Sequence, residues 1–280
     1  MKALGSFSFF LIFGTLVSGV QAEFLYQGSY YIQGGSYRSE SKSDTKPVTI
    51  DGSLFESNGQ ITLDTVLSGK AGPYGLGLKL DFHGNDGGLF GGIHKGGILV
   101  QSFDAVRLVA RTPTVIVLPN TQLFFNGTLT GYEDSDSRSS FNQLNMTVAV
   151  INNFTTLNLL GLKGPLGAVV TGNATLDSQL RTSFSISAGL SFGLQNFEHV
   201  VDASHTFELT SITFADGTTP EQLGYDLVFD SGRISPNLRS VPEPSSFILL
   251  SLGSLGLYLA KAKRTTKRRL AAPETRSKTH

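Results

Sequence analysis

Two histidines flank a glycine-rich stretch and could bind a metal ion. His83 and His94 bracket the segment HGNDGGLFGGIHKGG, which also contains Asp86. Imidazole and carboxylate groups are common zinc ligands, but this spacing matches no closed zinc pattern and the chain has no cysteine. The stretch also lacks the Gly-Lys-Ser/Thr ending of a phosphate-binding loop. We therefore expect a loop with incidental histidines, and no bound metal or other cofactor.

A short acidic run is the second candidate for chemistry. Glu133, Asp134 and Asp136 lie in the segment EDSDS and are weak candidates for Ca²⁺ ligands, because hard cations prefer oxygen donors. The run lacks the glycine and the distal glutamate of an EF-hand loop. A solvated loop between two strands is the favoured interpretation.

The sequence contains no recognisable catalytic frame. It has no Gly-x-Ser-x-Gly motif and no paired carboxylates in a known arrangement, and His199 has no Ser or Asp partner that the sequence identifies. We therefore predict a protein that is not an enzyme. An extracellular hydrolase of the β-sandwich type is an open alternative, because catalytic triads assemble in space and not along the chain.

Four tyrosines near the start of the body could contact sugars. Tyr26, Tyr30, Tyr31 and Tyr37 lie close together in a chain that has no tryptophan. Tyrosine rings can stack on sugar rings, although the larger indole is the stronger platform. We favour core and edge-strand roles for these residues. A carbohydrate-binding module that uses tyrosines on one sheet face is the alternative.

The elements that must position these residues are strands. Apolar and polar residues alternate with a period of two in many segments, for example residues 61–67, 76–82, 146–150, 184–192 and 225–229. Asp-Gly, Asn-Gly and Ser-Gly turn signals separate these segments. The pattern predicts nine to thirteen strands in an all-β, antiparallel β-sandwich, jelly-roll-like, over residues 23–234. We also expect a β-bulge within residues 207–214, one helical turn at residues 219–223 and a polar loop at residues 34–46.

The charges of the chain are segregated. The formal net charge is zero, but residues 23–240 contain thirteen basic and twenty acidic residues, a net charge of about −7. An acidic body does not attract a phosphate backbone, so nucleic acid is excluded as an expected partner.

The first 22 residues have the layout of a secretory signal peptide. Lys2 supplies the positive start, residues 7–17 are apolar, and Val20 and Ala22 are small residues at the positions that signal peptidase inspects. We expect cleavage after Ala22, so that the mature chain begins at Glu23. The predicted partner for this step is the Sec export machinery.

The other end of the body carries a three-part segment. Val241, Pro242, Glu243, Pro244 and Ser245 are followed by an apolar run at residues 247–260 and then by a basic cluster, comprising Lys261, Lys263, Arg264, Lys267, Arg268 and Arg269. As a helix the apolar run is about 21 Å long, short of the roughly 30 Å hydrocarbon core. The basic cluster should stay on the cytoplasmic side. The two prolines hold the tripeptide extended.

These three parts together resemble the PEP-CTERM sorting signal of exported bacterial proteins. The resemblance covers residues 242–269, leaving a linker at residues 235–241 and a tail at residues 270–280. It implies an exosortase as processing partner, transient residence in the inner membrane, and delivery to the outer surface or the extracellular space. The chemistry would then belong to the processing enzyme. We therefore expect a non-enzymatic surface or matrix protein linked to extracellular polysaccharide or biofilm.

Overall fold

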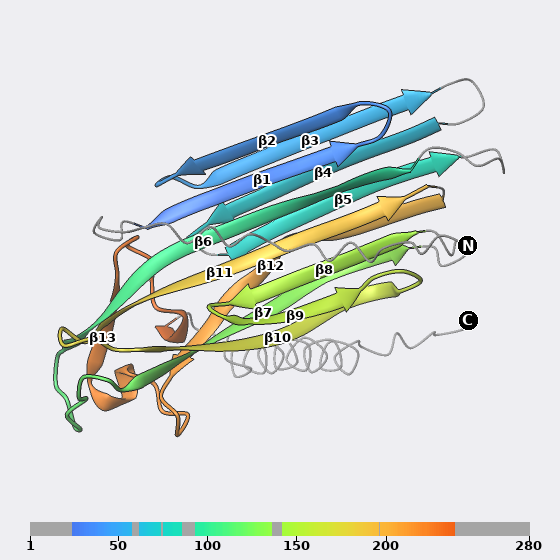
Figure 1. The fold of residues 1–280 in the computed structure, drawn as a ribbon. Coiled ribbons are helices and arrows are strands. Elements are labelled where there is room, and N and C mark those ends of the chain that lie inside the picture. The colour runs from blue at the N-terminus through green and yellow to red at the C-terminus, as the bar shows by residue number, and fades with distance from the viewer. Residues whose placement is uncertain are drawn as a thin grey trace, which may run out of the picture. The chain divides into compact units, whose positions relative to one another are not determined.

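Alternating apolar side chains produce two antiparallel sheets in the computed structural model of this protein (Figure 1). The structure describes residues 24–57, 62–73, 75–85, 93–135, 142–195 and 197–238. Within these ranges it has thirteen strands and two short 3₁₀ helices. Most strands bury one face and expose the other, as period-two alternation requires, whereas the edge strands β2 and β9 have no buried residue. The predicted all-β sandwich is confirmed.

Sheet A has seven strands in the order β2-β1-β6-β11-β8-β9, and β13 pairs with the distal part of β6. The strands are β1 (Leu25–Gln33), β2 (Tyr37–Asp44), β6 (His94–Ala110), β8 (Gln143–Val150), β9 (Asn153–Asn158), β11 (Arg181–Leu194) and β13 (Tyr225–Phe229). The edges of the six-strand path are therefore β2 and β9.

Sheet B has six strands in the order β10-β7-β12-β5-β4-β3. The strands are β3 (Val48–Ser57), β4 (Thr62–Gly72), β5 (Gly75–Asn85), β7 (Gln122–Ser135), β10 (Lys163–Thr175) and β12 (Phe197–Thr213). The chain first makes the β1-β2 hairpin of sheet A and then the β3-β4-β5 meander of sheet B. After β5 it changes sheet at nearly every connection, so the two sheets are built together.

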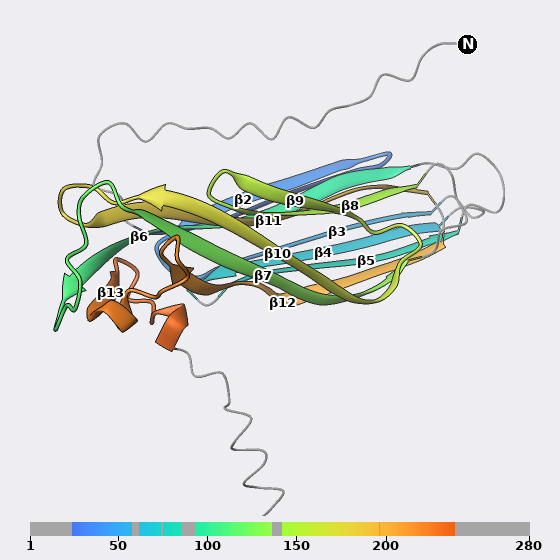
Figure 2. The same ribbon diagram turned by 90° about the horizontal axis from the view of Figure 1, so that it is seen from below.

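The two sheets face each other across one hydrophobic core, and Figure 2 shows the two layers. The largest fully buried side chains include Phe82, Phe125 and Phe207 from sheet B. Phe125 stacks on Phe184 of sheet A with ring centroids 4.9 Å apart. Fully burying one such side chain stabilises the fold by roughly 1.5–3 kcal/mol. The core therefore holds the two sheets in a fixed orientation, with their outer faces exposed.

Local expectations are confirmed at two places and wrong at a third. The register of β12 shifts between Leu209 and Ser211, which is the predicted bulge, and η1 (Glu221–Leu223) is the predicted helical turn. The predicted loop at residues 34–46 is instead mostly strand β2, paired with β1 along its whole length. The strand has no buried residue, so no apolar alternation marks it in the sequence.

The end of the described chain is fastened to the body. The Asn237 side chain accepts a hydrogen bond from the backbone N–H of Ile212 and donates one to its carbonyl, at 2.9 Å each. It also donates to Glu221 at 2.8 Å, and the Ser235 hydroxyl donates to the same carboxylate at 2.6 Å. Residues 235–237, placed by the sequence in a linker, therefore lie against the body.

Candidate functional site: the outer face of sheet A

The outer face of sheet A carries almost no charge where β2, β1, β6, β11, β8 and β9 lie side by side, whereas Arg107, Arg181 and Asp226 lie beyond this part, where β6 pairs with β13. Its side chains alternate with the inward-facing ones on β2, β1, β6, β11, β8 and β9, and the strand register aligns them in rows. We call this surface the neutral face; it comprises Tyr37, Ser39, Ser41, Ser43, Leu25, Gln27, Ser29, Tyr31, Gln33, Lys95, Gly97, Leu99, Gln101, Phe103, Ser185, Ser187, Gly189, Ser191, Gly193, Gln143, Asn145, Thr147, Ala149, Phe154, Thr156 and Asn158. Lys95 is the one charged residue of this set.

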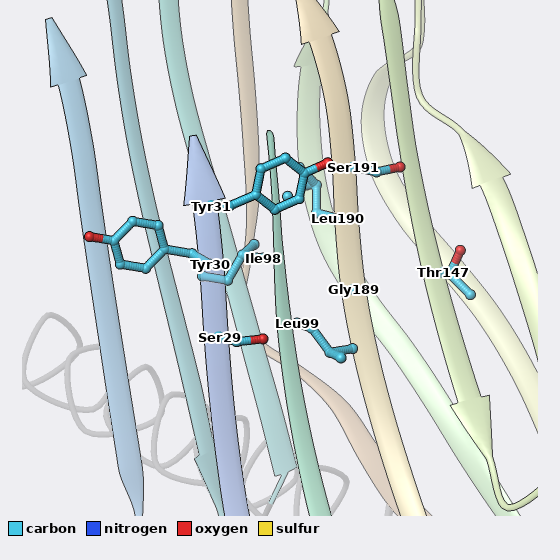
Figure 3. Close-up of a pocket in the computed structure, with 10 residues that line it drawn as sticks. Ser29, Tyr30, Tyr31, Ile98, Leu99, Thr147, Gly189, Leu190 and Ser191 are labelled. Carbon is cyan, nitrogen blue, oxygen red and sulfur yellow. The ribbon is translucent and has the colours of Figure 1, made fainter. Parts of the chain in front are cut away.

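A groove of about 250 Å³ lies in the middle of the neutral face (Figure 3). Tyr31 and Leu99 give it apolar walls, while Ser29, Thr147 and Ser191 place hydroxyl groups around it. Small ligands bind in such sites through apolar contact supplemented by a few polar groups. The groove is therefore suited to a flat, uncharged molecule that carries hydroxyl groups.

Glycine makes room for the tyrosine that borders the groove. A Cβ atom at Gly97 would lie 3.4 Å from the Tyr31 ring and 2.9 Å from the Leu190 carbonyl oxygen, so the ring lies across a position without a side chain. Figure 3 shows Tyr31 reaching over the sheet toward Ser191 while Tyr30 points away. Burial raises the pKa of the Tyr31 phenol, and nearby Tyr37 raises it further. The hydroxyl is therefore a neutral donor and acceptor.

The four tyrosines predicted from the sequence divide between the two faces of sheet A. Tyr31 and Tyr37 belong to the neutral face, and Tyr37 is 62% exposed. Tyr26 is buried in the core, and Tyr30 packs against it from the inner face, over Gly52 of β3. The structural roles that we favoured from the sequence therefore fit Tyr26 and Tyr30, whereas Tyr31 and Tyr37 lie on the neutral face.

The two histidines of the glycine-rich stretch point in opposite directions. His83 is on the outer face of sheet B, where its ring lies 2.9 Å from Asp81 and 3.5 Å from Glu198. His94 begins β6 and is fully buried between the sheets. Asp86 lies outside the described residues. The structure thus gives the two histidines separate surroundings and does not bring them together as ligands.

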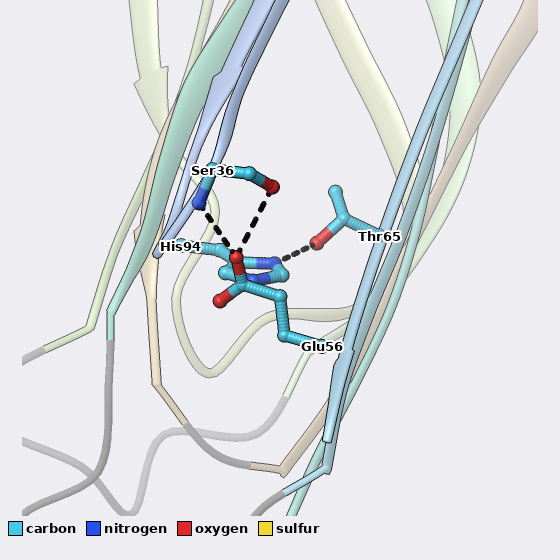
Figure 4. A network of polar contacts seen from close by, with 4 residues as sticks. All are labelled: Ser36, Glu56, Thr65 and His94. Carbon is cyan, nitrogen blue, oxygen red and sulfur yellow. Dashed lines mark hydrogen bonds and ion pairs between the residues drawn. The ribbon is translucent and has the colours of Figure 1, made fainter. Parts of the chain in front are cut away.

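His94 is the centre of a polar network that links the two sheets (Figure 4). Its Nδ1 atom lies 2.7 Å from the Thr65 hydroxyl, and its Nε2 atom lies 3.2 Å from a Glu56 carboxylate oxygen. The other Glu56 oxygen accepts hydrogen bonds from the Ser36 backbone N–H at 2.9 Å and from its hydroxyl at 3.3 Å. The network therefore fixes the β1–β2 turn to sheet B.

The pKa of Glu56 reflects these contacts. Partial burial would raise it, but hydrogen bonds from the backbone of Gly35 and Ser36 and from His94 outweigh burial and lower it below the usual range. Gly34 is needed at this turn because a Cβ atom there would lie 2.6 Å from both Glu56 and His94.

His199 has a second, independent network. Its Nδ1 atom lies 2.8 Å from the Ser135 hydroxyl and its Nε2 atom lies 3.0 Å from the Asn142 side-chain amide. Asn142 in turn accepts a hydrogen bond from the backbone N–H of Gln195. Phe82 separates the two histidines, with its ring centroid 6.3 Å from that of His94 and 5.9 Å from that of His199.

Both networks contain a hydroxyl group next to an imidazole, as in the nucleophile and general base of a catalytic triad. Thr65, His94, Ser135 and His199 are each 0% exposed, so a substrate would reach them only if the sheets separated. Buried polar groups that are fully hydrogen-bonded rigidify a core. The arrangement supports a structural role for both networks.

The three acidic residues considered as Ca²⁺ ligands do not converge in the described structure. They were expected in a loop, but β7 extends through Ser135, and strand alternation sends Glu133 and Asp134 to opposite faces. Glu133 is completely buried, whereas Asp134 is exposed and pairs with Lys163 at 2.8 Å. Asp136 lies outside the described residues. Within those residues, no group of three or more His, Asp or Glu side chains could hold a metal ion.

Sequence reasoning missed the groove and the partners of both buried histidines. The groove residues Ser29, Thr147 and Ser191 occupy the polar positions of alternating strands, whereas period-two alternation marks a strand by its apolar positions. The missing signal is the near absence of charge at those positions. The pairings of His94 with Thr65 and of His199 with Ser135 join residues 29 and 64 positions apart, respectively, so only the fold reveals them.

Residues 240–264 match the PEP-CTERM protein-sorting motif. The predicted sorting signal is confirmed: the chain carries the PEP-CTERM motif of an exported protein that an exosortase processes and that is held transiently at the membrane. The match includes the predicted residues Val241–Ser245 and the basic residues Lys261, Lys263 and Arg264. The signal peptide and the sorting segment lie outside the described residues.

Two further comparisons gave no match. No curated protein and no solved structure is significantly similar to this chain. Among the residues that the structure describes, no helix is long and apolar enough to cross a membrane.

Proposed function

We propose that the mature protein is a non-enzymatic component of the bacterial surface or extracellular matrix. The observation that carries this proposal is the sorting motif at residues 240–264, which assigns the acidic β-sandwich to export. The burial of both imidazole–hydroxyl pairs supports a role without catalysis. The domain then acts through its surface.

Intact-mass analysis of the exported protein tests this processing route. The protein is expressed in two hosts that differ only in an exosortase. A product that begins at Glu23 and ends near Pro242–Pro244, formed only with the enzyme, is the expected result. A product that extends to His280 in both hosts contradicts it. A substrate screen for hydrolysis of polysaccharides and esters tests the non-enzymatic part, and turnover that is lost in a Thr65→Val or Ser135→Ala variant would overturn it.

A second function is favoured by the groove: binding of extracellular polysaccharide on the neutral face. Sugar rings present apolar faces ringed by hydroxyl groups. The groove offers Tyr31 and Leu99 for apolar contact, with Ser29, Thr147 and Ser191 as hydrogen-bonding partners. Tyrosine combines a large contact area with a polar end, which suits this type of ligand. The near absence of charge on the face favours an uncharged polymer.

A pair of tyrosines provides a matched test of this second function. Tyr31 borders the groove, whereas Tyr132 is 52% exposed on the outer face of sheet B. Tyr31→Ala should weaken retention on immobilised polysaccharide from the producing bacterium by about tenfold, in line with the 1–3 kcal/mol of a stacked ring. Tyr132→Ala should leave retention unchanged. Equal effects of the two substitutions, or no retention of the wild type, would exclude the groove as the binding site.

A further inference from the structure

Strand β2 is an exposed edge whose outer side has no partner within the described residues. It pairs with β1 from Tyr26–Asp44 to Gln33–Tyr37, and all eight of its residues are exposed. Figure 1 shows it at the margin of sheet A. Such an edge presents a row of unpaired backbone N–H and carbonyl groups that can template another strand. The Glu56–His94 network fixes the preceding turn, so the edge is held in an extended, paired conformation.

The side chains of β2 separate into two kinds. Ser39, Ser41 and Ser43 continue the neutral face, opposite Tyr31, Ser29 and Gln27. The other face carries four charges in alternating order, Arg38, Glu40, Lys42 and Asp44. Lys42 forms an exposed ion pair with Glu40 at 2.9 Å and donates a hydrogen bond to the Thr49 carbonyl at 3.3 Å. The signs therefore read plus, minus, plus, minus along the strand.

This order of charges is complementary to itself when a second copy runs antiparallel. With a two-fold axis through Ser41, Arg38 lies opposite Asp44 of the second copy and Glu40 lies opposite Lys42 of the second copy. The symmetry repeats both pairs, so all four charges of each copy face an opposite charge. Opposite charges directly across an antiparallel pair stabilise it, and like charges destabilise it.

Other registers are disfavoured by the same charges. Sliding the antiparallel pair by two residues brings Lys42 opposite Lys42 or Glu40 opposite Glu40. A parallel pair in register places every charge opposite its own kind. A pattern that merely protected an edge from association would not need this order, because any charged strand repels non-specific pairing.

We propose that two copies of the protein associate through β2, in an antiparallel pairing with its two-fold axis at Ser41. A two-fold interface uses the same patch on both copies, as a self-complementary strand requires. The pairing joins the two A sheets edge to edge and makes the two neutral faces continuous. If the neutral face binds polysaccharide, as proposed above, two linked faces would bind one polymer with increased avidity.

Two single charge reversals test the pairing. Glu40→Lys and Lys42→Glu each place like charges opposite one another in the homodimer. Each should therefore weaken the association of the exported protein at least tenfold, measured by sedimentation at low salt. The two variants are complementary to each other, so an equimolar mixture should form the heterodimer with the wild-type affinity. Lys70→Glu, the same reversal on the outer face of sheet B, should have no effect. A monomeric wild type, or a mixture no tighter than its components, overturns the proposal.

Cysteine substitutions test the register independently, because the wild-type chain has no cysteine. Ser41→Cys places two thiols on the axis, within the Cα separation of about 4.4–6.8 Å that a disulfide allows. It should form a crosslinked dimer on mild oxidation. Ser39→Cys lies on the same face, but its counterpart in the second copy is four residues away, about 13 Å along the strand. It should remain uncrosslinked. Equal crosslinking of both variants, or of neither, contradicts the pairing.

Both experiments concern association alone, and neither contains a polysaccharide. Their failure would therefore leave the proposed surface function intact, and a failure of polysaccharide binding would leave the dimer intact.

Discussion

The two outer faces of the sandwich have the same strand geometry and very different chemistry. The neutral face of sheet A carries hydroxyl, amide and small side chains with the single charge of Lys95. The outer face of sheet B carries more acidic than basic residues, namely Asp51, Asp64, Asp81, Asp134, Glu198, Asp202 and Glu208 against Lys70, Lys79 and Lys163. Part of the excess of acidic residues in the body is therefore concentrated on the outer face of sheet B.

This difference separates two tasks that a surface must perform. Net charge keeps an exported protein soluble, and the charged face of sheet B contributes to that. A face without charge can contact an uncharged ligand without the cost of removing water from ions.

Glu133 is an exception to the outward placement of acidic residues on sheet B, because its carboxylate points into the core. It is fully buried, and within the described residues neither carboxylate oxygen has a hydrogen-bond partner. Burial raises the pKa of Glu133 from 4.5 to about 7, and the Asp134 carboxylate contributes further. The folded state therefore binds more protons than the unfolded state between these pH values. The stability linked to Glu133 is full below about pH 4.5 and is lost as the pH rises through 7.

Glu133→Gln should remove this pH dependence. At pH 8 the variant should be more stable than the wild type by on the order of 2–3 kcal/mol, while at pH 5 the two should be similar. Urea denaturation at both pH values measures the difference. A wild type that is equally stable at pH 5 and pH 8 would contradict the burial of an ionisable carboxylate at this position.

A charge introduced into the neutral face should weaken its binding of an uncharged polymer. Ser191→Asp places a carboxylate in the groove and should weaken binding to the polysaccharide by about tenfold, because desolvating one charge costs at least 1.4 kcal/mol here. Ser68→Asp is the matched control, since Ser68 is also a half-buried serine on the outer face of a central strand, in sheet B. Retention on the immobilised polysaccharide compares them, and equal losses would mean that charge acts at a distance and not in the groove.

Lys95 tests whether the polymer is uncharged. It lies at one end of the neutral face, in the row that contains Gln33 and Gly193. Lys95→Ser should change binding to an uncharged polymer by less than about threefold, with no dependence on salt. A loss of tenfold or more that disappears in high salt would show instead that the face binds an acidic polymer through this lysine.

The inner face of the sandwich was easier to predict than its outer faces. Apolar alternation, as in residues 76–82 and 184–192, located strands that bury the core, because burying those residues drives folding. Strand β2 was missed for the same reason: its eight residues bury nothing and gain their order from pairing with β1. Edge strands of this kind depend on the rest of the sheet.

The candidate site could be predicted only in part. Tyr31 was among the tyrosines identified, but the strand register decides that it faces out and that Tyr30 faces in. The groove combines β1, β6, β8 and β11, which are far apart in sequence. The sorting motif, by contrast, is a local pattern of adjacent residues, and the sequence was sufficient to recognise it.

Breaking the ion pair between Lys163 and Asp134 should have the smallest effect of all, because it should hardly change the free energy of unfolding. Both side chains are at least half exposed, and water and salt screen their attraction. Asp134→Asn should therefore change the free energy of unfolding by about 0.5 kcal/mol or less, with even less effect at high salt. At pH 8, Glu133→Gln, one residue away, should produce a change several times larger. If the two substitutions had equal effects in urea denaturation, the distinction between the inner and outer faces of β7 would fail, because the exposed carboxylate would then matter as much as the buried one.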